Sequence, residues 1–191
     1  MYRLKLSDSQ SKRAVEAYRT NNAAVPALWK NYEAAAVWAV KHPNKVIARN
    51  YCRFWVKEKF LWVQLPSGRK LAYREPQISW RETDWGESKE TLEFMAVNSK
   101  TKKWNLERTW GGTLTENIVQ ATAREFLMHG MLRLEKAGYR ALFSVHDEAI
   151  CEREIGKGTL AEFVEILCEL PEWAKGLPLE AKGWRGERYR K

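Results

Sequence analysis

An acidic tripeptide interrupts an otherwise apolar stretch between Ala141 and Cys151. Five residues that favour a buried strand lead into His146-Asp147-Glu148, and a second apolar run follows. This pattern predicts two strands joined by a tight polar turn. Adjacent carboxylates repel each other, so the turn needs either a cation to neutralise them or full exposure to water. The residues alone leave both interpretations open, a divalent metal site and a solvated turn.

Carboxylate oxygens suit magnesium, which takes only one or two protein carboxylates and keeps several waters. Two other chemistries have less support. A thiol nucleophile at Cys151 with His146 as its base lacks a third partner and an oxyanion element. A zinc site around His146 lacks a second His or Cys at ligand spacing.

Hydrophobic periodicity predicts the elements that surround this turn. A helix over 12–41 breaks near Asn21-Asn22, because Pro26 lies inside its pattern, and Ser9 or Ser11 caps its start. The segment 75–88 has the composition of a polar loop. Side chains of Thr113, Thr115 and Glu116 are expected to cap the start of a long helix. The other expected elements are hairpins of 60–65 with 70–74 and 92–97 with 103–110, a helix over 113–136, a hairpin over 139–152 and a helix over 159–170. Their order predicts an α+β fold.

Positive charge is concentrated in the first part of the chain. Residues 1–80 hold 15 Lys and Arg against 5 Asp and Glu, whereas residues 81–191 hold 18 against 19. This asymmetry favours a polyanionic partner, although excess lysine also serves solubility. The segment 51–62 interleaves aromatic rings with cations, which is typical of a half-buried strand and also of a surface that stacks on bases.

The chain has no apolar run of 18 residues, and its basic N-terminus lacks an apolar stretch, so neither a membrane span nor a signal peptide is expected. Its three cysteines lack paired spacing, which excludes a disulfide scaffold and favours a reducing cytosol.

Six blocks of the sequence, taken in order, resemble the C-terminal part of family A DNA polymerases of the bacteriophage type. The two longest blocks are Thr109–Glu125 and Pro171–Leu179 with the ending 188–191. The others are Val15–Arg19 with Leu28-Trp29, Leu65–Arg69 with Leu71–Tyr73 and Pro76, Leu134–Tyr139, and Val145–Glu148. The resemblance implies one C-terminal palm region over 1–191, with an antiparallel palm-type sheet whose hairpins pack on long helices. Its parts would be a helical lead-in (1–43), hairpins (44–112), and the long helix, acidic hairpin, last helix and tail (113–191).

The resemblance also implies roles for individual residues. Asp147 would bind a pair of Mg²⁺ ions, with Glu148 as the auxiliary carboxylate, and His146 would contact the primer terminus. Gln120 would meet the minor groove of the primer–template duplex, and Glu116, Asn117 and Arg124 would add DNA contacts. The implied reaction is template-directed transfer of a nucleotide from a dNTP by two-metal catalysis.

The family's first metal-binding aspartate and its fingers helix have no counterpart in these residues. We therefore expect no polymerase activity from the isolated chain, and a partner chain that supplies these motifs. The expected setting is the cytoplasm of a bacterial host, with a phage or prophage gene. The alternatives are a non-catalytic module that binds duplex DNA, and a truncated product without a function of its own.

Overall fold

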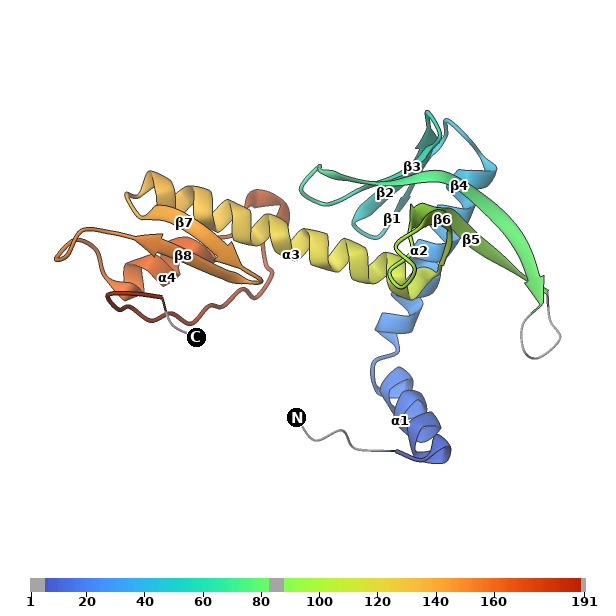
Figure 1. Ribbon diagram of the computed structural model, residues 1–191, viewed down its shortest axis with the longest axis horizontal. Coiled ribbons are helices and arrows are strands. Elements are labelled where there is room, and N and C mark those ends of the chain that lie inside the picture. The colour runs from blue at the N-terminus through green and yellow to red at the C-terminus, as the bar shows by residue number, and fades with distance from the viewer. Residues whose placement is uncertain (1–5, 83–87, 190–191) are drawn as a thin grey trace. The chain divides into compact units, whose positions relative to one another are not determined.

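The computed structural model describes residues 6–82 and 88–189, and it divides the chain into two compact units (Figure 1). Unit 1 comprises Met1–Gln64 and Lys70–Ile118, and unit 2 comprises Leu65–Arg69 and Val119–Lys191. The boundary falls within helix α3 (Gly111–Lys136), so one continuous helix contributes to both units. No helix in the described ranges is long and apolar enough to cross a membrane.

Unit 1 contains a six-stranded antiparallel sheet in which every strand pairs with the next one along the chain. Its helices are α1 (Asp8–Asn21) and α2 (Ala24–Lys41), and the helical pattern breaks where the sequence predicts. The strands are β1 (Val46–Arg49), β2 (Cys52–Lys57), β3 (Phe60–Gln64), β4 (Lys70–Glu82), β5 (Ser88–Val97) and β6 (Trp104–Thr109).

The core of unit 1 lies between α2 and one face of this sheet. Phe54, Leu61 and Val63 are fully buried, as are three alanines of α2. Tyr32 of α2 packs on Phe54 with ring centroids 5.6 Å apart. Small residues on α2 allow the helix to approach the sheet closely, and the large apolar side chains of β2 and β3 fill the space between them.

Two sequence predictions about helix starts are wrong. Ser7, rather than Ser9 or Ser11, caps α1, and it forms a capping box with Gln10. Helix α3 begins at Gly111, ahead of Thr115, whose hydroxyl donates to the Gly111 carbonyl inside the helix at 2.7 Å. The Gly111 N–H instead donates to Glu33 Oε2 at 3.1 Å, so a carboxylate on α2 satisfies the start of α3.

The prediction of a loop over 75–88 is also wrong for its described residues. Strand β4 continues to Glu82, and β5 begins at Ser88; residues 83–87 lie outside the described ranges. The register between β4 and β5 shifts between Arg74 and Gln77. Pro76, which has no N–H to donate, lies within this irregularity, and Glu75 adopts a φ of 47°. Proline usually ends a strand, but here a β-bulge accommodates Pro76 and the strand continues beyond it.

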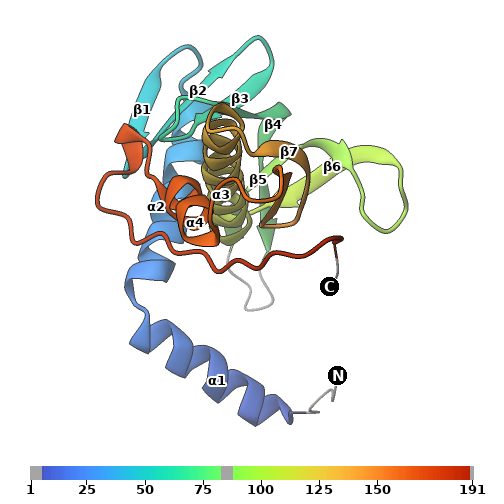
Figure 2. The same cartoon turned by 90° about the vertical axis from the view of Figure 1, so that its left-hand side faces the viewer.

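Unit 2 contains the hairpin β7 (Arg140–Val145) and β8 (Glu148–Glu152), helix α4 (Leu160–Cys168) and a 3₁₀ turn (Glu172–Ala174). Gly130 of α3 lies against α4, where an added Cβ would be 2.7 Å from both the Leu167 carbonyl oxygen and its Cδ1 atom. The last segment then runs alongside α4 (Figure 2), where Gly183 contacts Leu160. The α+β class and the antiparallel pairing agree with the sequence expectation.

Candidate functional site

The acidic tripeptide lies at the tip of the β7–β8 hairpin. Val145 pairs with Glu148, so His146 and Asp147 alone form the turn and Glu148 is the first residue of β8. All three are exposed. His146 adopts a φ of 53°, in the left-handed region that costs a non-glycine residue about 1–2 kcal/mol. Such conformations concentrate at functional sites.

The structure distinguishes the two neighbouring carboxylates. Tyr189 Oη donates a hydrogen bond to Glu148 Oε2 at 3.0 Å, and this bond raises the pKa of the Tyr189 hydroxyl. Within the described ranges, Asp147 has neither a hydrogen bond nor an ion pair. Glu148 is therefore held by the C-terminal segment, whereas the Asp147 carboxylate can accept a ligand without first losing a protein contact.

An aromatic cluster attaches the C-terminal segment to the hairpin. A register shift between Ala141 and Phe143 leaves Leu142 as a bulge residue and Phe143 half exposed. Tyr189 packs edge-on against Phe143 with centroids 5.7 Å apart, and Trp184 stacks on Tyr189 at 6.5 Å. The bulge thus exposes the Phe143 ring, and Tyr189 of the C-terminal segment packs on it. In this position the Tyr189 hydroxyl can hydrogen-bond Glu148.

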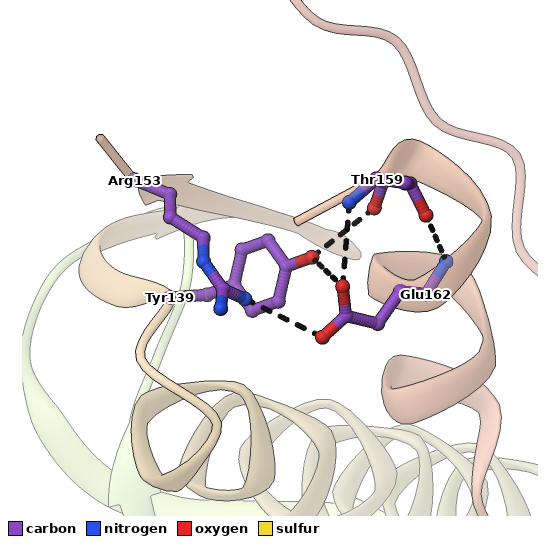
Figure 3. Close-up of polar contacts among 4 residues, drawn as sticks. All are labelled: Tyr139, Arg153, Thr159 and Glu162. Atoms are coloured by element: carbon purple, nitrogen blue, oxygen red, sulfur yellow. Dashed lines mark hydrogen bonds and ion pairs between the residues drawn. The ribbon is translucent and has the colours of Figure 1, made fainter. Parts of the chain in front are cut away.

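A second polar cluster holds the other end of the hairpin (Figure 3). Tyr139, just before β7, donates to Glu162 Oε2 at 2.9 Å, and Arg153, just after β8, lies over the Tyr139 ring at 4.1 Å. Glu162 also forms a capping box with Thr159 at the start of α4. The hydrogen bond from Tyr139, followed by those from Thr159 and Arg153, holds the pKa of Glu162 below its usual value. The cluster fixes both strand ends relative to α4.

The predicted DNA-contacting residues of α3 do not share one environment. Glu116, Gln120 and Arg124 are exposed and lie four residues apart, which places them on one face of the helix. Asn117 faces elsewhere, since its side chain donates to Tyr73 Oη of the sheet at 3.1 Å. Arg124 Nη1 donates to Ser144 Oγ at 3.1 Å and thereby links α3 to the strand that leads into the turn.

The donor set at the turn suits a hard cation. Two carboxylates lie next to each other in sequence, and the exposed Asp147 oxygens match the ligands that Mg²⁺ takes from proteins. The described ranges hold no group of three or more His, Cys, Asp or Glu side chains arranged to bind a metal.

Sequence reasoning assigned no role to Tyr189 or Ser144. Tyr189 lies in the ending 188–191 that belongs to the resemblance, but its contact with Glu148 spans 41 residues of sequence, so nothing in the sequence pointed to that contact. Ser144 lies in an apolar strand pattern, where a single serine carries no signal of its own.

Comparison with known proteins identifies a relative over almost the whole chain. The chain is 40% identical over 186 residues to the DNA polymerase of Bacillus phage SP02. The chain corresponds in sequence to a fragment of a DNA polymerase. The alignment covers 97% of this chain but only 28% of that polymerase. No family model matches the chain, and no solved structure matches it either.

Proposed function

We propose that this chain forms the C-terminal palm part of a family A DNA polymerase, and that Asp147 is one of the carboxylates of its nucleotidyl-transfer site. The observation that carries the proposal is the position of Asp147, an unpartnered carboxylate within the described ranges, at the strained tip of a hairpin. Similarity to a phage DNA polymerase over nearly the full chain supports the same reaction class.

Each side chain at the tip then has a role that its surroundings permit. Asp147 would bind Mg²⁺ directly, and Glu148, held by Tyr189, would set the local charge beside it. Mg²⁺ held by Asp147 and by carboxylates from elsewhere in the polymerase would supply activation of the attacking hydroxyl and charge stabilisation for the leaving pyrophosphate. The exposed His146 ring would contact the primer terminus.

The exposed stripe on α3 would follow the primer–template duplex. Gln120 would hydrogen-bond the minor-groove acceptors that every correct base pair presents, which checks pair geometry without reading sequence. Arg124 would bind a phosphate and, through Ser144, couple that contact to the hairpin.

The remaining metal ligands would come from polypeptide outside residues 1–191. Within the described residues, the sheet of unit 2 has only the two strands β7 and β8. Leu142 and Phe143 on β7 are also 47% and 45% exposed, which an additional strand would cover. We therefore propose that the chain alone does not extend primers, and that the assembled enzyme acts in the cytoplasm of the host bacterium.

A chimera tests this proposal directly. Residues 1–191 replace the matching segment of the phage SP02 DNA polymerase, and primer extension is measured with Mg²⁺. The chimera should extend the primer, Asp147→Asn should abolish extension while primer–template binding persists, and the matched control Glu165→Gln on α4 should remain active. An Asp147→Asn chimera that retains full activity would contradict the assignment.

The uneven charge of the chain favours a second candidate function, a non-catalytic module that binds duplex DNA through residues 1–80. In that case the isolated chain would bind duplex DNA in a salt-sensitive manner. The Asp147→Asn substitution would then leave the affinity for duplex DNA and its salt dependence unchanged.

A further inference from the structure

The sheet of unit 1 has one face that α2 does not cover. In the antiparallel register, residues directly opposite each other share a face. Val46 pairs with Trp55, Trp55 with Trp62, and Trp62 with Ala72, so these residues point away from the buried face that carries Phe54, Leu61 and Val63. We call the part of this surface on β1, β2, β3 and the first residues of β4 the open face; its positions are Val46, Ala48, Arg53, Trp55, Lys57, Phe60, Trp62, Gln64, Lys70, Ala72 and Arg74.

The composition of the open face is unusual for a solvated sheet surface. Four of its eleven positions are cations, three are aromatic, and none is acidic. All four cations are exposed, namely Arg53, Lys57, Lys70 and Arg74. The three rings lie between them, partly exposed on β2 and β3.

One cation and the three rings of the open face make close contacts. Lys70 Nζ lies 5.5 Å from the centroid of the Trp55 ring, within cation–π range, and the Phe60 and Trp62 rings are 5.5 Å apart. Lys57 and Arg74 form ion pairs with Glu58 and Glu75, at 3.7 Å and 3.4 Å. These pairs are exposed, so water and salt screen them and leave both cations able to exchange their partners for phosphates.

We propose that the open face binds single-stranded DNA. Phosphates would pair with the cations, while unpaired bases would stack on Trp55, Trp62 and Phe60. A duplex keeps its bases stacked on each other and cannot offer their faces to a sheet, whereas a single strand can. An acid-free surface that carries both rings and cations matches the charge and the stacking chemistry of that ligand. The choice of DNA over RNA rests on the proposed function.

The test measures binding of a fluorescein-labelled 20-nucleotide oligo(dT) to the full chain by anisotropy, in EDTA. Without divalent ions, the result is independent of the proposed role of Asp147, so failure here and failure of the proposed function can be told apart. We expect the single strand to bind at least about tenfold more tightly than a 20-base-pair duplex. Equal or tighter binding of the duplex would overturn the inference.

Two matched pairs of variants locate the site. Trp55→Leu with Trp62→Leu should weaken oligo(dT) binding about tenfold or more, since each stacked base contributes strongly. The control Trp80→Leu, which removes a 67% exposed ring of β4 outside the open face, should leave the affinity unchanged. Circular dichroism and the melting temperature verify that each variant is folded.

The second pair keeps the inference testable if the tryptophan variants unfold. Arg53→Gln with Lys70→Gln removes two exposed cations and should flatten the dependence of log K on log salt by about 0.7 per cation. Lys45→Gln with Arg49→Gln removes one exposed cation that precedes β1 and one that pairs with Cys52 on the opposite face, and should leave the slope unchanged. Equal effects of both pairs would overturn the open face as the binding site.

Discussion

Tyr189 Oη donates a hydrogen bond to Glu148 Oε2 at 3.0 Å, and this bond links the C-terminal segment to the acidic hairpin. The same tyrosine packs on Phe143, so its position is set by a ring contact as well as by the hydrogen bond. Glu148, which follows Asp147, is thus oriented by a side chain 41 residues away in sequence. Together with the proposed function, this relationship predicts that the tail affects primer extension by the chimera.

Tyr189→Phe removes the hydroxyl and keeps the ring stack. In the chimera, we expect primer extension to slow by about tenfold, because groups that orient residues beside a metal ligand tune activity without binding the metal themselves. The melting temperature should barely change, since the bond is exposed. The measurement is single-turnover extension at saturating dNTP. Tyr18→Phe, on α1, serves as the control, and equal rates for both variants would exclude a positioning role for Tyr189.

His129 should make the stability of the chain depend on pH near neutrality. Burial, and then the nearby Arg133 and Lys136, lower the pKa of the imidazole, and its Nε2 atom is buried without a hydrogen-bond partner in the described part of the chain. Because the unfolded state binds the proton more tightly, the free energy of unfolding should fall as the pH drops below about 6.5. Urea denaturation between pH 7.5 and 5.5 measures this slope.

The variant His129→Leu provides the comparison. It removes the unpaired polar atom together with the titration, so its free energy of unfolding should stay constant over this pH range and match or exceed that of the unmodified chain at pH 5.5. Identical pH profiles for the two proteins would show that another group causes the dependence.

Glu93 should stabilise unit 1 above pH 4.5 and lose this effect in acid. Burial alone would raise its pKa, but hydrogen bonds from Arg81, at 2.9 Å, and Gln77 lower it below 4.5. The stabilisation is therefore complete above the unfolded-state pKa and disappears as the pH falls through the folded-state value. Glu93→Gln should cost about 1–3 kcal/mol at pH 7.

Denaturation at two pH values checks the Glu93 prediction. The difference between Glu93→Gln and the unmodified chain should be large at pH 7 and should shrink toward pH 3. Glu58→Gln, at an exposed position, should have little effect at either value. A difference that is the same at pH 7 and pH 3 would refute the electrostatic explanation.

Gly130→Ala should destabilise unit 2, although alanine normally favours a helix over glycine by about 1 kcal/mol. The added Cβ would lie 2.7 Å from the Leu167 carbonyl oxygen, which belongs to the backbone of α4 and cannot rotate away. Overpacking of this kind costs about 1–3 kcal/mol. Chemical denaturation measures whether the free energy of unfolding falls or rises in the variant. A more stable variant would mean that α3 and α4 separate easily.

Local chemistry was sufficient to predict several features from sequence. The helix break near Asn21 and the acidic turn at residues 146–147 follow from proline and from strand alternation, which act over a few residues. The role of Asp147 stays a prediction, as do those of Gln120, Glu116 and Arg124. Asn117 illustrates the limit of such reasoning, because its bond to Tyr73 depends on how α3 meets the sheet.

The sequence by itself determined where the chain turns, which segments are apolar and that two carboxylates follow one another at residues 147 and 148. Only the tertiary structure decided that β4 passes Pro76 through a bulge, that Glu148 rather than Asp147 is held by Tyr189, and that Trp55 and Trp62 share an open face with exposed cations. The physical reason is the separation in sequence over which each kind of interaction acts. Turn and strand propensities arise between neighbouring residues, whereas register and tail docking join segments whose separation in sequence carries no signal of their contact.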